Sequence, residues 1–368
     1  MVAAGVRSIL MTTDTVGGVW TYAVELSRAL ARRGVAVTLA ALGRTSEAQR
    51  RSARGLDLFE RDFKLEWMDD PWEDVRASGE WLVDLCALVQ PDVVHLNGYA
   101  HAALPWPAPV LVVGHSSVPG WCDAVRREAP PPRFDRYRDA AVRGASAAAV
   151  VVAPTHAMLR ELDRFFGPLR AARVIPNARD PRPFATTRKE PLVLAAGRLW
   201  DEAKNLHALD EAAAGCPWPV YVAGDPRHPD GGEAGASNAR LLGPLEPEEL
   251  AVWMAHAAIY ALPALYEPFG LSVLEAALSG CALVLGDIAS LRELWTGMAA
   301  FVDPRDPEAL AAALRRLARD ESRRMRLSEL ARARALGMDP DLMAAQYVSA
   351  YEAAMSAPRR ELRAGAAA

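Results

Sequence analysis

The chain has 368 residues, of which 51% are apolar and 24% are charged, and its formal net charge at neutral pH is −4. This length exceeds what one hydrophobic core usually supports, so we expect two domains. The slight acidity gives no general attraction to nucleic acid, which argues against a nucleic-acid-binding protein. The cysteines lack C-x-x-C spacing, which predicts reduced thiols in a cytoplasmic protein rather than a zinc site or a disulfide framework: Cys86, Cys122, Cys216 and Cys281.

Short β-rich runs alternate with helical patterns, a rhythm typical of doubly wound parallel sheets. The first series of expected strands comprises residues 8–13, 35–41, 93–96, 110–113, 148–153 and 174–175. A Pro- and Arg-rich stretch, 176–191, interrupts it, and a second series begins with 192–196, 220–223, 240–242, 259–262 and 282–285. We therefore predict two Rossmann-like α/β domains, 1–186 and 187–338. Facing sheets of this kind would form one cleft between them.

The remaining segments are predicted to lie outside the two sheets. Residues 339–368 should provide a last helix, with Asp339 as its N-cap, and a disordered tail over 364–368. Two polar or Pro-rich stretches, 44–56 and 121–138, are predicted to be loops over the first-domain side of the cleft and would select what binds on that side. An Arg-rich helix over 312–336 is expected to be solvated and salt-bridged, with contact to an anionic membrane as the alternative. We expect neither a signal peptide in residues 1–10 nor a membrane span.

Two adjacent glycines, Gly17 and Gly18, separate the first strand from a helix expected over 21–32. Because neither glycine has a Cβ, a ligand can approach the backbone closely at this turn. A purely steric reason for the pair fits the sequence equally well.

Two basic residues, Arg198 and Lys204, follow the first strand of the second series. Fixed positive charges at a strand end can offset the two negative charges of a nucleoside diphosphate and stabilise it as a leaving group. The alternative is that both are surface charges paired with Asp201 and Glu202.

Two glutamates, Glu267 and Glu275, border a helix that is expected to begin near Ser272, with Glu275 in its first turn. Free N–H groups at a helix N-terminus favour phosphate, and carboxylates accept hydrogen bonds from hydroxyls. The combination suits a sugar nucleotide. The alternative is a capped core helix with two solvated glutamates.

The segment Glu-Pro-Phe-Gly-Leu-Ser-Val-Leu-Glu, residues 267–275, resembles the E-x7-E motif of glycosyltransferase family 4, whose members are retaining enzymes of the GT-B fold. Residues 197–205 are similar to the family's Gly-Arg-Leu-x-x-x-Lys-Asn pattern, with one extra residue before the lysine. Asn177 resembles the asparagine of the interdomain Pro-Asn-Gly element, although Ala178 replaces the glycine. The resemblance extends over nearly the whole chain, and it implies a GT-B fold whose last helix packs on the first domain.

The resemblance also implies roles for individual residues. Glu275 would accept hydrogen bonds from the ribose hydroxyls of the donor, and Glu267 would bind the sugar hydroxyls. His115, at the end of the strand over 110–113, is a structural histidine on position alone, but the resemblance implies that it lies beside the donor sugar. Arg198 and Lys204 would hold the diphosphate. Backbone groups are expected to complete the donor site at Gly17, Gly18, Phe269, Gly270, Leu271, Ser272 and Val273.

The resulting hypothesis is a retaining glycosyltransferase that moves a hexose from a UDP- or GDP-sugar to the hydroxyl of a saccharide, a lipid-linked acceptor or a small molecule. We predict no cofactor and no metal, because the sequence has no Asp-x-Asp motif at a strand end and no cluster with ligand spacing. We also expect no nucleic-acid partner and at most peripheral membrane contact. The alternatives are a nucleotide-sugar 2-epimerase of the same fold, a glycoside hydrolase that uses Glu267 and Glu275, and a nucleotide-sugar-binding protein without turnover.

Overall fold

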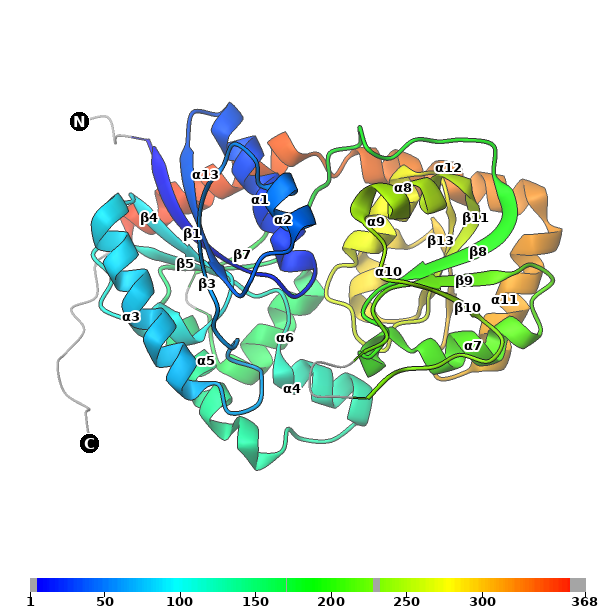
Figure 1. The fold of residues 1–368 in the computed structure, drawn as a ribbon, viewed down its shortest axis with the longest axis horizontal. Helices are drawn as coiled ribbons and strands as arrows, with labels where there is room; N and C mark the ends of the chain where they lie inside the picture. Colours follow the sequence, from blue (N-terminus) through cyan, green and yellow to red (C-terminus); the bar gives the residue numbers. More distant parts are fainter. Residues whose placement is uncertain (1–4, 170, 228–231, 358–368) are drawn as a thin grey trace.

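The computed structural model describes residues 5–169, 171–227 and 232–357, so the prediction for the tail 364–368 lies outside the described residues. Two parallel sheets lie side by side, each with helices on both faces (Figure 1). This architecture confirms the expected pair of doubly wound α/β domains. An irregular linker, residues 175–189, joins the two sheets and contains the predicted domain boundary.

The first sheet, within the described residues, has the order β3-β2-β1-β4-β5-β6-β7 and is parallel throughout. Its central strands β4, β5 and β6 are buried along their whole length, as expected for strands covered on both faces. The strands are β1 Ser8–Asp14, β2 Ala36–Leu42, β3 Asp57–Arg61, β4 Val93–Leu96, β5 Val110–Val113, β6 Val150–Ala153 and β7 Ala172–Val174. The helices are α1 Gly18–Arg32, α2 Glu47–Ser52, α3 Trp72–Val89, η1 Ala100–Ala103, α4 Val118–Trp121, η2 Cys122–Arg126, η3 Pro132–Phe134, α5 Asp135–Ala147 and α6 His156–Phe166.

The second sheet, again within the described residues, has the order β10-β9-β8-β11-β12-β13 and is also parallel. Its strands are β8 Glu190–Ala196, β9 Val220–Ala223, β10 Arg240–Gly243, β11 Ala257–Leu262, β12 Ala282–Gly286 and β13 Ala299–Val302. The helices are η4 Glu202–Lys204, α7 Leu206–Ala214, α8 Pro247–His256, α9 Leu271–Leu278, α10 Ala289–Trp295, α11 Pro307–Arg319 and α12 Glu321–Leu336.

The last described helix, α13 Pro340–Ser356, leaves the second domain and runs back across the first (Figure 1). Asp339 caps it by accepting hydrogen bonds from the N–H groups of Asp341 and Leu342. Its inward face packs on α1 and joins the same hydrophobic core as β1, with Tyr347 and Tyr351 fully buried. The core of the first domain is therefore completed by residues that follow the second domain in the sequence.

Several local predictions were wrong. The edge strand β3 was not predicted, because its sequence Asp-Leu-Phe-Glu-Arg mixes polar and apolar residues. The predicted loops 44–56 and 121–138 contain helices, α2 in the first and α4, η2, η3 and the start of α5 in the second. The Arg-rich segment that was predicted to be one helix forms two, α11 and α12. Asp320 separates them, and its carboxylate accepts a hydrogen bond from the Arg323 N–H of α12 at 2.9 Å. Glu275 lies in the second turn of α9, since that helix begins at Leu271.

Candidate active site at the domain junction

The order of each sheet reverses at one pair of neighbouring strands, β1 with β4 in the first sheet and β8 with β11 in the second. Ligands of open α/β sheets bind beyond the carboxyl ends of the strands at such a switch point. In the first domain this edge carries the Gly17–Gly18 turn after β1 and Asn97 after β4. In the second it carries Arg198 after β8 and Glu267 after β11. Both switch points therefore present residues with candidate binding roles.

The two switch points meet at the Gly17–Gly18 turn. The Arg198 Nη1 atom donates a hydrogen bond to the carbonyl oxygen of Val16 at 3.3 Å. A Cβ on Gly18 would lie 3.1 Å from Leu271 Cδ1, and Gly17 has φ +119°, a conformation that favours glycine. The N-termini of α1 and α9 therefore approach each other across the junction. Each contributes a partial positive charge, so the space between them favours an anion.

Arg198 and Lys204 are both engaged in ion pairs. The Arg198 Nη2 atom lies 2.9 Å from Asp201 Oδ2, as the surface-charge alternative proposed. Lys204 instead pairs with the other site residue, its Nζ atom lying 2.6 Å from Glu267 Oε2, and the two side chains are 17% and 14% exposed. Burial acts to raise the pKa of the Asp201 carboxyl, but the charges of Lys204 and Arg198, together with hydrogen bonds to the carboxylate, hold that pKa below its ordinary value. The loops after β8 and β11 thus form a compact cluster of two cations and two carboxylates.

The N-terminus of α9 is opened by Gly270, which has φ +88°. The Phe269 N–H group points at the Glu267 carboxylate, with 3.4 Å between nitrogen and Oε1. The Val273 N–H group already donates to the Gly270 carbonyl oxygen at 3.1 Å. Among the described residues, no acceptor is recorded for the N–H groups of Leu271 and Ser272, so these two are the better placed to meet an anion.

Glu275 is held by a residue that the sequence analysis missed, Arg179 of the linker. The Arg179 Nε atom lies 2.8 Å from Glu275 Oε1, and its Nη1 atom lies 2.7 Å from Glu25 Oε1 on α1. The three side chains are between 12% and 15% exposed. Burial raises the pKa of the Glu275 carboxyl, and the positive charge of Arg179 opposes that rise. Arg179 therefore connects a carboxylate of each domain.

His115 follows β5 and is half-buried. Its Nε2 atom lies 2.8 Å from Asn97 Oδ1, and its ring packs edge-on against Tyr22 with 4.6 Å between centroids. A second, fully buried histidine, His95 on β4, shares the Asn97 side chain. Burial lowers the pKa of both imidazoles to about 3, so both are neutral at physiological pH.

Polar contacts close the junction on the α6 side. Tyr266, next to Glu267, donates from its hydroxyl to Glu161 Oε1 at 2.7 Å and accepts from the Ser117 N–H at 3.0 Å. Nearby, the Trp121 indole donates to Asp201 Oδ1 at 3.0 Å. The Glu293 carboxylate of α10 caps α6 by accepting two of its N–H groups, at 2.7 and 2.9 Å. These contacts keep the two domains together around the site.

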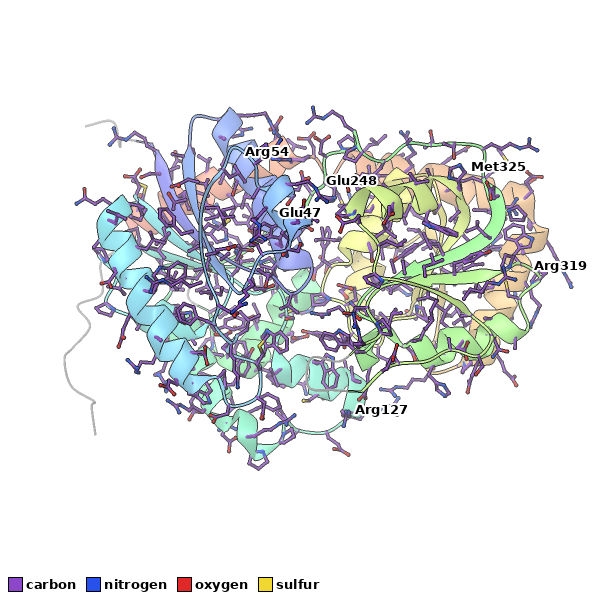
Figure 2. The ribbon with its side chains drawn as sticks, in the orientation of Figure 1. Glu47, Arg54, Arg127, Glu248, Arg319 and Met325 are labelled. Atoms are coloured by element: carbon purple, nitrogen blue, oxygen red, sulfur yellow. The ribbon has the colours of Figure 1, made fainter. Side chains whose placement is uncertain are left out.

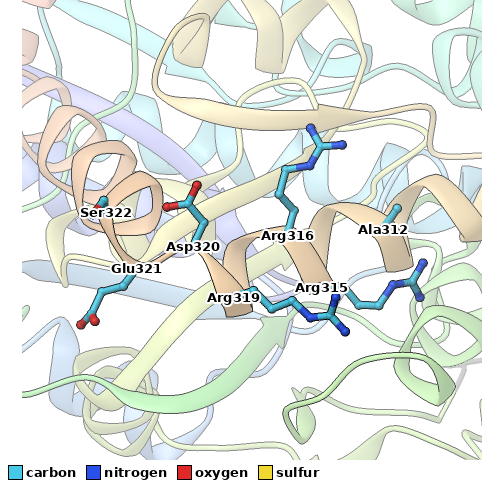
Figure 3. Close-up of a pocket in the computed structure, with 7 residues that line it drawn as sticks. All are labelled: Ala312, Arg315, Arg316, Arg319, Asp320, Glu321 and Ser322. Atoms are coloured by element: carbon cyan, nitrogen blue, oxygen red, sulfur yellow. The ribbon is translucent and has the colours of Figure 1, made fainter.

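Outside the junction, the corner between α11 and α12 forms a surface hollow of about 650 Å³ lined by Arg315, Arg316, Arg319 and Asp320 (Figure 3). Arg315 and Arg319 extend from one side of α11 and Arg316 from another. Arg319 lies on the side of the second domain away from the first (Figure 2). The hollow therefore shares no residue with the candidate site.

The residues that the structure describes contain no group of three or more His, Cys, Asp or Glu side chains arranged to hold a metal ion. Within the same residues, every helix is too short or too polar to cross a lipid bilayer. The candidate site itself contains cations, helix N-termini and carboxylates. Such a set is suited to a phosphorylated ligand that also carries hydroxyl groups.

The fold is that of a GT-B protein, with two Rossmann-like domains and a candidate site at their junction. Solved structures share this fold over nearly their whole length. Sucrose-phosphate synthase from Thermosynechococcus elongatus is 19% identical with a TM-score of 0.79, covering 94% of this chain and 98% of that one. Anabaena Alr3699/HepE in complex with UDP-glucose is 17% identical with a TM-score of 0.75, covering 94% and 99%.

The sequence comparisons identify the family. The family described as Glycosyltransferase Family 4 matches residues 16–182, and that described as Glycosyl transferases group 1 matches residues 190–320. Together the two matches support a GT-B glycosyltransferase that resembles family 4. D-inositol 3-phosphate glycosyltransferase from Xylanimonas cellulosilytica is 29% identical over 95% of this chain and 94% of that protein. The enzyme of that name from Corynebacterium urealyticum is 35% identical, but the match covers only 34% of this chain and 30% of that protein.

The junction brings together most of the residues expected from the sequence, namely Gly17, Gly18, Arg198, Lys204, Glu267, Phe269, Gly270, Leu271, Ser272, Val273 and Glu275, with His115 beside Asn97. It adds Arg179, Glu25 and Asn97, which were not expected. Asn177 is buried, and its side-chain oxygen has no hydrogen-bond partner recorded among the described residues. The one sequence signal for Arg179 was its position directly after the Asn177–Ala178 element.

Proposed function

We propose that the protein is a retaining glycosyltransferase that transfers a hexose from a nucleoside diphosphate sugar, with UDP- and GDP-sugars as the first candidates, to an acceptor hydroxyl. The observation that carries the proposal is the convergence of two helix N-termini, two cations and two glutamates at the switch points of both sheets. Family membership supports it, and so does a structural neighbour in complex with UDP-glucose.

In the proposed reaction the diphosphate binds at the start of α9, where the N–H groups of Leu271 and Ser272 donate to phosphate oxygens. Arg198 and Lys204 neutralise the negative charge that develops on the leaving group. In this proposal they supply the positive charge that a metal ion provides in other enzymes. The Lys204 ammonium has three N–H donors, so it can keep its contact with Glu267 and still bind a phosphate oxygen.

The carboxylates orient the organic parts of the donor. Glu267 binds sugar hydroxyls beside the leaving group, and Glu275 accepts hydrogen bonds from the ribose. The bond between the anomeric carbon and the diphosphate oxygen breaks while the acceptor oxygen bonds to the same face of the carbon. The acceptor proton passes to the departing diphosphate. The contacts between the domains exclude water and hold this geometry.

Titration calorimetry of the metal-free protein with UDP, GDP, ADP and dTDP tests the donor site directly. We expect selective binding of one base. If none of the four binds, the glycosyltransferase proposal fails.

Incubation with the matching sugar nucleotide then separates the enzyme classes. A transferase consumes the donor only when an acceptor hydroxyl is supplied, and NMR of the product should show the donor's anomeric configuration retained. Epimerisation of the donor without an acceptor would indicate a nucleotide-sugar 2-epimerase. Release of free sugar without an acceptor would indicate a hydrolase. Tight donor binding without any turnover would indicate a binding protein.

A further inference from the structure

The side-chain amide of Asn97 is fixed in one orientation by Thr12. Its Nδ2 atom lies 2.6 Å from the Thr12 carbonyl oxygen, and its backbone N–H donates to Thr12 Oγ1 at 2.9 Å. A carbonyl oxygen can only accept a hydrogen bond, so the NH₂ group of the amide must face Thr12. The Oδ1 atom of Asn97 therefore faces the other way, toward the two histidines.

An amide oxygen accepts hydrogen bonds and cannot donate them, so it dictates where its histidine neighbours carry their protons. Asn97 Oδ1 lies 2.8 Å from His115 Nε2 and 3.3 Å from His95 Nε2. The His115 ring must then present an Nε2–H group to this oxygen, and His95 can do the same, although its Nε2 atom also lies 3.3 Å from the hydroxyl oxygen of Tyr22. Burial keeps both rings neutral, because it lowers their pKa to about 3. A neutral imidazole with a proton on Nε2 has a lone pair on Nδ1.

The surroundings of His95 agree with this assignment. Its Nδ1 atom lies 2.7 Å from the hydroxyl oxygen of Tyr351 on α13. Burial raises the pKa of Tyr351 well above its ordinary value, so the hydroxyl keeps its proton and can donate it to Nδ1. His95 therefore uses both ring nitrogens within the protein. For His115, among the described residues, a hydrogen bond is recorded at Nε2 and none at Nδ1.

We propose that Asn97 is a positioning residue that holds His115 as its Nε2–H tautomer, so that His115 offers the unprotonated Nδ1 to the ligand as a hydrogen-bond acceptor. The proposal rests on the proposed function and specifies the chemistry of one contact. The site then favours a ligand hydroxyl, because a hydroxyl can donate a hydrogen bond to Nδ1. It disfavours a carboxylate or carbonyl oxygen, because the lone pairs of that oxygen would repel the lone pair of Nδ1. His115 does not protonate the leaving group.

The tautomer is measured in the free full-length protein with ¹⁵N-labelled histidine, by long-range ¹H–¹⁵N correlation of the imidazole rings. The variant His115→Gln assigns the His115 signals among those of the seven histidines. We expect a protonated Nε2 and an unprotonated Nδ1 in the wild type. A protonated Nδ1 would overturn the proposal, and this measurement needs no variant at Asn97.

Two variants separate tautomer control from a packing role. Asn97→Asp keeps an acceptor toward both rings and should keep the Nε2–H pattern at His115. Asn97→Leu has a similar volume but no acceptor, and it should give a mixture of the two tautomers. If Asn97→Leu retained the pure Nε2–H pattern, Asn97 would not be the residue that sets it.

The ligand contact is tested by adding UDP or UDP-glucose, or GDP and GDP-mannose if the guanine nucleotide binds. The sugar conjugate should shift the His115 Nδ1 signal, whereas the nucleoside diphosphate alone should not. His115→Leu should reduce the ratio of conjugate to diphosphate affinity about 2- to 10-fold, the value of one neutral hydrogen bond. A bound conjugate that leaves Nδ1 unshifted would overturn the contact. Failure of every nucleotide to bind would sink the proposed function instead, while the tautomer result would stand.

Discussion

The Glu25–Arg179–Glu275 chain predicts strong coupling between two residues that lie far apart in the sequence. Replacement of Arg179 by Met removes the one cation recorded between two carboxylates that are 12% and 14% exposed. Loss of one member of a buried ion pair typically costs about 3–5 kcal/mol, because the remaining charge stays desolvated. We expect Arg179→Met to destabilise the protein by that amount.

The measurement is a double-mutant cycle of Arg179→Met and Glu275→Gln, with unfolding by urea followed by both tryptophan fluorescence and circular dichroism. The unfolding transitions followed by the two signals must coincide. Otherwise the two domains unfold separately, and a single free energy of unfolding is not defined. A charge-assisted contact predicts a coupling free energy of about 1.5–3 kcal/mol. The control is the exposed pair Arg76 and Glu80, 2.6 Å apart on one face of α3, for which about 0.3–0.5 kcal/mol is expected. If the Arg179–Glu275 coupling did not exceed that of the control, the buried chain would not connect the domains as argued.

Three further predictions concern the donor site and the pH dependence of folding. Lys204→Ala should weaken nucleoside diphosphate binding about 10- to 100-fold in titration calorimetry, because a charge-assisted contact to phosphate is lost. The exposed Lys64 provides the control, and an equal effect of Lys64→Ala would point to a general charge effect. Glu267→Ala should spare binding of the free nucleoside diphosphate and impair binding of its sugar conjugate; equal losses for both would refute its assignment to the sugar. Burial lowers the pKa of His95 from 6.5 to about 3. Between these two pH values the His95 side chain is protonated in the unfolded state and neutral in the folded state. The stability contributed by neutral His95 is therefore complete above about pH 6.5 and is lost as the pH falls toward 3, by about 1.4 kcal/mol per pH unit. Because His115 has a similarly lowered pKa, His95→Gln should remove only the contribution of His95 to the slope of urea unfolding between about pH 6 and pH 4, whereas replacement of His207, whose side chain is 86% exposed, should leave the slope unchanged.

The sequence predicted those parts of the fold that local pattern determines. Strands buried on both faces, such as Val93–Leu96 and Val110–Val113, are short runs in which every residue except His95 is apolar, and both were placed to the residue. The edge strand Asp57–Arg61 has a partly exposed, mixed pattern, so nothing local distinguished it from a loop. Asp320 could not be recognised as a break between two helices, since its capping role depends on its backbone conformation.

The candidate site was predictable where a continuous motif carries it, as in residues 267–275. Partners across the chain were not predictable. Arg179 is one arginine in an irregular linker, and only the tertiary structure places it against Glu275. The role of Asn97 likewise depends on the tertiary structure. Because β1 and β5 lie on either side of β4, Thr12 contacts the Nδ2 atom of Asn97 and His115 contacts its Oδ1 atom. The roles assigned to these site residues remain predictions until the binding measurements are made.

The return of α13 to the first domain fixes an order of events during protein synthesis. A ribosome releases β1 to β7 before it has made α13, so the apolar faces of α1 and the first sheet that Tyr347 and Tyr351 will cover stay exposed while the whole second domain emerges. The domain that is made first therefore finishes packing last. A chain that ends before Pro340 would leave the apolar faces of α1 and the first sheet exposed, which favours aggregation of the truncated protein.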